Sequence, residues 1–381
     1  MSATPHRFTR DGGAALEARL QQTCDQVLAG VRALIPAAKL DGLLLGGGYG
    51  RGEGGVLRAP VGDQPYNDLE FYVFVRGHAV LAERQFRHPL HELGEKLSPA
   101  AGLEVEFKVL TLDKLRRSPP SMFYYDLVMG HCWQAGDDAL LAGCEHHRDA
   151  AQIPPHEATR LLMNRCSGLL FSLARLTGKN FAAEDADFVG RNLAKAQLAF
   201  GDVLLTAHGQ YHWSCQERHN RLVKLDFSPF PWAAPLKSHH AAGVEFKLHP
   251  TRSAETPTTL AARHAELSAL GEKLWLWLEA KRLGRNFASA REYAFSPTIK
   301  CPETSSLRNR LVNLRAFGAA GLACPRYPRE RLLHTLPLLL WDKNSLSDPK
   351  PAEFVRAALR TPAGDLAGLV AAYARLWSRF N

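Results

Sequence analysis

Two acidic side chains stand at the head of an apolar run in the first third of the chain. Asp68 and Glu70 are separated by one leucine, and the residues that follow, Phe71 to Val75, are apolar or aromatic. In a β-strand alternate side chains project from the same face, so these two carboxylates would lie about 7 Å apart along it. Carboxylate oxygens are the ligands that small hard cations such as Mg²⁺ prefer. The spacing therefore favours a divalent-metal site.

A glycine-dense loop precedes the two acids. It follows the apolar residues Leu43 to Leu45 and carries Arg51 and Glu53. Glycine lets backbone N–H groups approach a phosphate closely, and a helix start after such a turn favours negative charge. Mg²⁺ in proteins often binds together with substrate phosphates. Loop and acids together predict a metal-dependent nucleotide site; the alternative is a flexible turn beside two surface acids.

The order of these residues resembles the motif of the nucleotidyltransferases of the DNA polymerase β superfamily. The resemblance covers roughly residues 40–110 and rests on Gly47-Gly48-Tyr49-Gly50-Arg51-Gly52-Glu53 and Tyr66-Asn67-Asp68-Leu69-Glu70. It is strongest to the small-molecule branch typified by kanamycin nucleotidyltransferase, whose second acid is also a glutamate. Gly48 and Asn67 stand where that family has serine, so one hydroxyl contact to the triphosphate is lost. Neither departure removes a carboxylate.

The resemblance implies a third metal-binding carboxylate on a strand beside the paired acids. Residues 103–110 alternate between apolar and polar side chains, which predicts a strand with Glu104 and Glu106 on one face. We favour Glu106, because an apolar residue and a Val-Leu run follow it as they follow the third acid of the family. Glu104 is the alternative. A solvated strand face without a metal role would show the same alternation.

The implied reaction is transfer of a nucleoside monophosphate from a nucleoside triphosphate, with ATP favoured, to an acceptor hydroxyl, releasing pyrophosphate. Asp68 and Glu70 would bridge two Mg²⁺ ions, and Glu106 would complete the metal site and serve as candidate general base. The acceptor is not specified by the motif. A small molecule is favoured, and an RNA acceptor stays open.

The same resemblance assigns a phosphate-binding role to the glycine loop and to basic side chains. Backbone donors at Gly47 and Gly48 would hold the outer phosphates, and Arg51 would add positive charge. A helical bundle in this family often lends a further basic residue. Arg191 and Lys195, four residues apart in a predicted helix, are the candidates, and a solvated basic edge of that helix is the alternative.

Periodicity around these residues predicts an α+β fold, in which a small mixed sheet flanked by helices (the nucleotidyltransferase fold) is followed by an all-α helical bundle region. We expect a catalytic domain over 1–150, a helical bundle over 151–226, a linker or loop over 227–258 and a C-terminal helical domain over 259–381. The first boundary follows from Pro154-Pro155, because consecutive prolines end one element and can start the next helix. Helices are expected at 14–34, 81–97, 122–129, 156–176, 184–207, 215–225, 260–283, 305–322, 329–340, 352–359 and 364–380, and a short strand at 131–133.

Composition narrows the class of protein. The 381 residues are 46% hydrophobic and 22% charged, as in ordinary globular proteins, and the net charge of +9 favours anionic partners such as nucleoside triphosphates or RNA. The polar start and the lack of a long apolar run predict neither a secretory signal nor a membrane span. P-loop, nucleophile-elbow and zincin motifs are absent from the sequence.

The seven cysteines are scattered and form no C-x-x-C pair, which favours reduced thiols in a cytoplasmic protein over disulfides or structural zinc. Cys144 with His146 and His147 is the one cluster worth weighing as a metal site, and a surface turn is the favoured explanation. Two other functions compete with catalysis: an inactive nucleotide-binding or regulatory module, and an RNA-binding or RNA-modifying protein. Pairing of two copies around a shared site, as in some small-molecule nucleotidyltransferases, is a further expectation.

Overall fold

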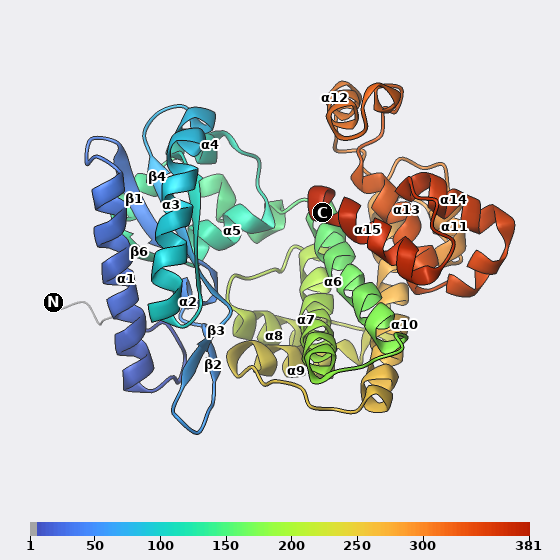
Figure 1. Cartoon of the computed structure of the whole chain (residues 1–381), viewed down its shortest axis with the longest axis horizontal. Coiled ribbons are helices and arrows are strands. Elements are labelled where there is room, and N and C mark those ends of the chain that lie inside the picture. The colour runs from blue at the N-terminus through green and yellow to red at the C-terminus, as the bar shows by residue number, and fades with distance from the viewer. Residues whose placement is uncertain (1–5) are drawn as a thin grey trace. The chain divides into compact units, whose positions relative to one another are not determined.

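The computed structural model describes residues 6–381, which form two compact units (Figure 1). The first unit extends to residue 154 and includes residues 208–224 and 244–251; the second comprises the remaining segments. All six strands of the described residues lie in the first unit, and the second is helical, so the chain is α+β. Among the described helices, none combines the length and apolar character needed to cross a membrane.

A mixed sheet with the strand order β5-β4-β1-β6 forms the centre of the first unit. The central strand β1 (Leu40–Leu45) pairs antiparallel with β4 (Asp68–Val75) and with β6 (Cys132–Ala135). The edge strand β5 (Glu104–Leu110) pairs parallel with β4. Parallel neighbours need a long crossover connection, and α3 (Ala79–Ala101) provides it.

Both faces of this sheet are buried under helices. Leu43 and Leu45 of β1 join a core with α1 (Ala14–Leu34) and α3, whereas Leu44 between them joins a second core on the opposite face. Helices α4 (Leu112–Arg117) and α5 (Met122–Met129) cover that second face. The one-residue alternation of the strand therefore assigns each leucine to its core.

The same alternation positions the two acids of β4. Tyr72 and Phe74 belong to the second core, so Asp68 and Glu70, two residues apart on the same face, point to that side of the sheet. Both acids are only half-buried, whereas Phe74 is fully buried. The start of β4 thus presents carboxylates at the open end of a face that is apolar further along the strand.

Contacts with α3 hold the edge strand β5 in place. The Ser98 hydroxyl accepts a hydrogen bond of 3.0 Å from the backbone N–H of Val105 and donates one of 2.7 Å to the carbonyl of Gly94. A Cβ at Gly94 would lie 2.3 Å from the Val105 carbonyl oxygen, so only glycine lets the helix come this close. These contacts tie the position of β5 to that of the helix.

A short hairpin lies outside the main sheet. Its strands are β2 (Gly55–Leu57) and β3 (Gln64–Tyr66), which pair antiparallel between the glycine loop and β4. The loop itself contains a single helical turn, α2 (Gly47–Gly50). Helix α8 (Cys215–Lys224), much later in the sequence, belongs to the same unit.

The second unit is built on three long helices that pack on one another, α6 (Pro155–Leu176), α7 (Ala183–Ala207) and α10 (Pro257–Leu283). Shorter helices follow. Their bounds are α11 (Ala290–Phe295), α12 (Ser306–Phe317), α13 (Arg329–Leu340), α14 (Pro349–Leu359) and α15 (Leu366–Phe380). Helix α13 contacts α6, α11, α14 and α15 and so connects the two sets.

The predicted linker over 227–258 is not an unstructured segment. It contains a 3-10 turn at Pro231–Ala233 and helix α9 (Leu236–Leu248). The prolines that suggested a linker end at Pro235 and resume at Pro250, so the helix occupies the proline-free interval between them. The expectation of a loop was wrong for residues 236–248, because the prolines flank this helix and do not interrupt it.

Candidate metal centre

Three carboxylates from two neighbouring strands meet at the open end of the sheet. One carboxylate oxygen from each of Asp68, Glu70 and Glu106 lies within 4.8 Å of the others. The parallel register places Glu70 opposite Glu106, and Asp68 one pleat earlier on the same face. All three side chains are half-buried. The structure thus brings together the three acids that the sequence selected as metal ligands.

Like charges at this distance disfavour full ionisation. Burial raises the pKa of Asp68, and the neighbouring Glu70 carboxylate raises it further. Burial likewise raises the pKa of Glu106, with Asp68 as the next cause. A site made of oxygen donors with excess negative charge has the chemistry of a divalent-cation site. The donor set therefore fits Mg²⁺.

Glu104 is the acid that the cluster leaves out. It lies opposite Asp68 in the register of β4 and β5, yet its side chain is exposed and is not among the three clustered carboxylates. Glu106 is further along the strand, opposite Glu70, and is half-buried within reach of both acids of β4. Of the two alternatives for a third acid, the geometry brings Glu106 to the site.

Two further side chains contact Glu70. The Tyr72 hydroxyl donates a hydrogen bond of 3.0 Å to Oε2 of Glu70, and the ammonium of Lys108 lies 3.7 Å from Oε1. Lys108 also lies over the Tyr72 ring, 5.5 Å from its centroid. One ammonium beside three carboxylates leaves the cluster short of positive charge. The ammonium of Lys108 lies beside Glu70 at a place that a metal cation could take.

The glycine loop approaches the cluster from β1. The backbone N–H of Gly46 donates a 2.8 Å hydrogen bond to the Glu70 carbonyl, which ties the end of β1 to β4. Gly47 has φ of +61°, and a Cβ there would lie 3.0 Å from Oε2 of Glu70. A side chain at this position would be strained and would crowd the carboxylate. Glycine keeps the space beside Glu70 open.

Gly48 stands where the resembling family carries serine, and the fold explains why a larger residue is disfavoured. A Cβ at Gly48 would lie 3.0 Å from the carbonyl oxygen of Glu53, because the loop doubles back against itself. The Gly48 carbonyl accepts hydrogen bonds from the N–H groups of Arg51 and Glu53. A serine side chain at position 48 would therefore require this tight turn to shift.

Glu53, also in the loop, has a structural role. Its carboxylate accepts hydrogen bonds from the Ser214 hydroxyl at 2.5 Å and from the Cys215 N–H at 2.9 Å, at the first residue of α8. The side chain is buried, and these bonds lower its pKa although burial alone would raise it. A carboxylate at a helix start satisfies donors that have no partner within the helix.

Arg51 is held by an ion pair beside the cluster. Its guanidinium lies 2.9 Å from Oδ2 of Asp126 on α5, and the Tyr211 hydroxyl donates to the same oxygen at 3.2 Å. Two buried atoms of this pair, Nε of Arg51 and Oδ1 of Asp126, have no hydrogen-bond partner within residues 6–381. Both residues line a cavity of about 110 Å³ that also touches Glu70 and Lys108. Unpartnered polar atoms indicate that the cavity suits a polar occupant.

A larger groove lies on the other side of Glu106. It has a volume of about 770 Å³ and runs between α3 and β5, with Arg84, Arg87 and His91 among its lining residues. Its size falls in the range of small-molecule sites, roughly 300 to 1,000 Å³, whereas the cavity beside Arg51 is smaller than that range. Within the cluster, Glu106 thus lines the ligand-sized groove and Glu70 lines the phosphate-sized cavity.

Arg191 and Lys195 lie on α7, in the second unit. Arg191 pairs with Asp187 one turn earlier, at 3.2 Å, and Lys195 is exposed on the same helix. No residue of α7 belongs to the carboxylate cluster or to the lining of the cavity beside Arg51. The assignment of these two residues to phosphate binding stays a prediction.

In the cluster of Cys144, His146 and His147, one ring nitrogen of each histidine is hydrogen-bonded to a backbone carbonyl. Nε2 of His147 is hydrogen-bonded to the Leu115 carbonyl and Nε2 of His146 to the Ser118 carbonyl, both at 2.9 Å. Cys144 and His147 are buried. The two histidines thus tie the turn to the preceding segment, and His146 and its neighbour Glu145 are exposed, as in the surface turn that was expected.

Sequence reasoning missed Asp126 and the position of Lys108. Lys108 stands two residues after Glu106 in the alternating segment 103–110, and this spacing is a signal that it lies on the same face, beside the same cluster. Asp126 is one acid in the aromatic stretch of α5, and nothing nearby connects it with Arg51.

Comparison with known protein families, with curated proteins and with solved structures gave no match.

Proposed function

We propose that this protein is a Mg²⁺-dependent nucleotidyltransferase that moves a nucleoside monophosphate from a nucleoside triphosphate to an acceptor hydroxyl. The observation that carries the proposal is the convergence of Asp68, Glu70 and Glu106, whose carboxylate oxygens lie within 4.8 Å of one another. Two of the acids come from one strand and the third from its parallel neighbour. This is the arrangement that the motif resemblance implies for the nucleotidyltransferase fold.

The three acids would hold the metal. Mg²⁺, when bound there, lowers the pKa of an attacking hydroxyl and neutralises charge on the leaving pyrophosphate. Asp68 and Glu70 project from one face of β4 and are suited to bridging two ions. Glu106, whose pKa is raised by burial and by Asp68, is suited to accept a proton from the acceptor hydroxyl.

Arg51 and Lys108 would bind the phosphates. Both line the small cavity beside Glu70, and Nε of Arg51 is a donor without an acceptor among the residues that the structure describes. A guanidinium already fixed by Asp126 is preorganised, so little side-chain freedom is lost when an anion binds. Lys108 is exposed and is free to turn from Glu70 toward a phosphate once a metal satisfies that carboxylate.

The acceptor would use the groove beside Glu106. Its volume of about 770 Å³ suits a small molecule, and both acidic and basic side chains line it, including Glu83, Arg84 and Arg87. Lining residues of both signs favour a polar acceptor over an apolar one. ATP is the nucleotide we favour as donor.

The test is transfer of label from α-labelled nucleoside triphosphates, with Mg²⁺, to a cell extract separated into small-molecule, protein and RNA fractions. Wild type should label one fraction, and Asp68→Asn and Glu106→Gln should each reduce the label at least about 1,000-fold, because each removes a ligand of the ions that activate the reaction. The labelled fraction names the acceptor class.

Glu104→Gln is the matched control, since Glu104 lies on the same strand but outside the cluster. It should retain activity within about threefold. Nucleotide binding that needs Mg²⁺ but leads to no label in any fraction would replace the enzyme with a non-catalytic module. RNA binding that weakens steeply with salt, without nucleotide binding, would favour an RNA-binding protein.

A further inference from the structure

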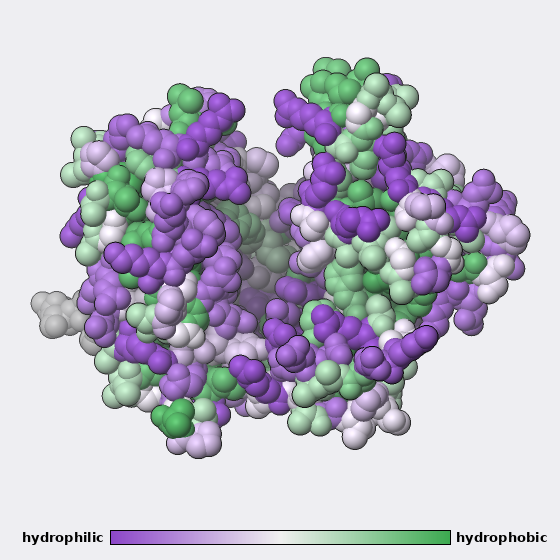
Figure 2. Space-filling model, viewed as in Figure 1, coloured by the Kyte–Doolittle hydropathy of each residue, from purple (hydrophilic) through white to green (hydrophobic). Residues whose placement is uncertain are grey.

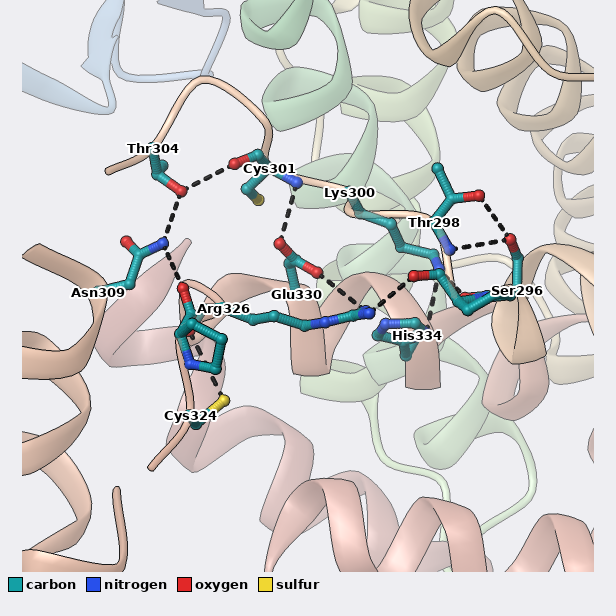
Figure 3. A network of polar contacts seen from close by, with 12 residues as sticks. Ser296, Thr298, Lys300, Cys301, Thr304, Asn309, Cys324, Arg326, Glu330 and His334 are labelled. Atoms are coloured by element: carbon teal, nitrogen blue, oxygen red, sulfur yellow. Dashed lines mark hydrogen bonds and ion pairs between the residues drawn. The ribbon is translucent and has the colours of Figure 1, made fainter. Parts of the chain in front are cut away.

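Helix α12 in the second unit is anchored by polar rather than apolar side chains. Its buried residues are Asn309 and Asn313. The Asn309 side-chain amide donates hydrogen bonds to the Thr304 hydroxyl at 3.0 Å and to the Pro325 carbonyl at 2.9 Å (Figure 3). Asn313 donates to the backbone carbonyls of Cys324 and other residues at 2.7 to 3.2 Å. Backbone contacts to a loop therefore fix the orientation of the helix.

The opposite face of α12 presents leucines to the solvent. Leu307, Leu311 and Leu314 are 70%, 52% and 37% exposed. Figure 2 shows apolar residues gathered over α12 with hydrophilic residues beside them. In an α-helix these three positions fall within an arc of about 60°. Turning the leucines toward the protein would bury more apolar surface. The hydrogen bonds of the two asparagines instead keep all three leucines facing the solvent.

The leucine stripe has the spacing of a coiled-coil seam. Leu307, Leu311 and Leu314 are separated by four and three residues, as alternating d and a positions are. In this register Arg310 falls at a g position, and Arg308 and Arg315 fall at e positions. The helix carries no acidic residue. Every position that flanks the seam with a charge is therefore cationic.

We propose that the exposed face of α12, made of Leu307, Leu311, Leu314, Arg308 and Arg315, docks an amphipathic helix of a partner protein that carries apolar residues at its seam and glutamates or aspartates beside it. Opposite charges at e and g positions set partner choice in helix pairs. The leucines supply buried area and the arginines supply selectivity. The surface shares no residue with the acidic cluster, so partner binding and nucleotidyl transfer stand or fall separately.

A second copy of the chain is a poor occupant of this face. Two α12 helices side by side would place arginines against arginines, and like charges at these positions oppose pairing. A lipid surface is also disfavoured. Helices that lie in a membrane interface bury a broad apolar face, often with aromatic residues, whereas a stripe of about 60° is the narrower seam of a helix pair.

The test uses the full chain and a labelled synthetic peptide of three heptads with leucine at a and d and glutamate at e and g. Fluorescence anisotropy should show binding to this peptide at least tenfold tighter than to a twin peptide with lysine at e and g. Leu311→Gln should weaken binding at least tenfold, because it puts an amide in the middle of the seam. Leu81→Gln, an equally exposed leucine on α3 at 63%, should leave binding unchanged.

Charge reversal gives a second, independent readout. Arg308→Glu with Arg315→Glu should exchange the preference, so that the lysine peptide binds and the glutamate peptide does not; both side chains are exposed. Three results would overturn the assignment. They are no binding of the glutamate peptide, Leu311-dependent binding to phosphatidylglycerol vesicles with no peptide preference, and a dimer in sedimentation velocity that Leu311→Gln abolishes.

Discussion

Two carboxylate sites in this protein treat negative charge in opposite ways. In the second unit Glu279 is fully buried and accepts hydrogen bonds from Arg282 at 2.6 and 2.9 Å, from the Tyr293 hydroxyl at 2.8 Å and from the Thr159 hydroxyl at 2.6 Å. In the first unit three carboxylates cluster at the end of a sheet with a single ammonium beside them. The first site is complete, and the second is short of positive charge.

The difference indicates what each site is for. A buried carboxylate with a paired guanidinium and two hydroxyl donors contributes to the fold, since removing one member strands the others. Half-exposed carboxylates that repel one another weaken the fold, and proteins keep such clusters where a cation or substrate completes them. Neutralising Glu279 should therefore destabilise the fold. Neutralising a carboxylate of the acidic cluster should instead stabilise the fold and weaken ligand binding.

The largest expected effect is on Glu279. Glu279→Gln should lower the free energy of unfolding by about 3 to 5 kcal/mol, because it leaves the buried guanidinium of Arg282 with only the carboxylate of Glu303, 4.0 Å away, as counter-charge. Urea denaturation followed by tryptophan fluorescence, to which the buried Trp275 on the same helix contributes, would measure it. Glu266→Gln, at an exposed position of α10, should change stability by less than about 0.5 kcal/mol. A loss below about 1 kcal/mol for Glu279→Gln would contradict a structural role.

Neutralising the acidic cluster should have the opposite sign. Asp68→Asn should stabilise the metal-free protein by up to about 1 kcal/mol, because it removes one of three repelling charges at a partly exposed site. The same change should weaken Mg²⁺ binding at least about tenfold. Calorimetric scans in EDTA and in Mg²⁺ would show both effects: wild type should gain Tm on adding Mg²⁺, and the variant should not. Loss of stability in EDTA would count against repulsion.

Lys300 provides a pH-dependent contrast within the second unit. The residue is 1% exposed, its ammonium lies 3.1 Å from the Ser296 carbonyl oxygen (Figure 3), and burial lowers its pKa to about 7. Between pH 7 and its ordinary value the unfolded chain holds a proton that the folded chain has lost, so stability rises with pH in that window. From pH 7 to 8.5 the gain should be about 2 kcal/mol, and it should vanish below pH 7.

The measurement is urea denaturation of wild type and Lys300→Met at several pH values. The difference between the two proteins isolates Lys300 from other groups that titrate in the same range. Lys273→Met, an exposed lysine on α10, is the matched control and should follow wild type. Parallel pH profiles for wild type and Lys300→Met would show that Lys300 keeps its ordinary proton affinity in the folded protein.

The smallest effect concerns Lys108, whose ammonium lies beside Glu70 of the acidic cluster. Lys108→Met should strengthen Mn²⁺ binding by about threefold to tenfold, because the ammonium 3.7 Å from Glu70 competes with the metal for that carboxylate. Nucleotidyl transfer should nevertheless fall, since a phosphate ligand is lost. Titration followed by electron paramagnetic resonance measures the first and label transfer the second. Lys114→Met, exposed on α4, should alter neither, and weaker Mn²⁺ binding by Lys108→Met would rule out competition.

Much of the fold could be predicted from local sequence patterns, and the remainder depends on tertiary contacts. Helices α1 and α5 begin and end at the predicted residues, because their apolar spacing and flanking residues are local signals. Helix α12 ends at Phe317, before the expected residue 322, since Gly318 with φ of +71° follows it. Helix α9 was missed because its apolar residues are not gathered on one face and its surroundings are rich in proline.

At the candidate site, the sequence was sufficient for side chains that share a strand and insufficient for partners from distant segments. Asp68, Glu70 and Glu106 follow from alternation and the motif. The pairing of Arg51 with Asp126, and of Glu53 with the start of α8, joins residues 75 to 162 positions apart. No local rule predicts such pairs, so the sequence assigned Arg51 to phosphate and could not show that Asp126 holds it.

The contacts between α3 and β5 decide which glutamate meets the acids of β4. Ser98 binds the N–H of Val105, and Gly94 fits against its carbonyl, so the helix sets how far β5 has slid along its neighbour. A slip of two residues would keep the same face toward the cluster and exchange Glu106 for Glu104. The identity of the third acid is thus encoded in a glycine and a serine on a helix that contributes no acid to the cluster. Evolution could change which glutamate joins the carboxylate cluster by altering α3 alone.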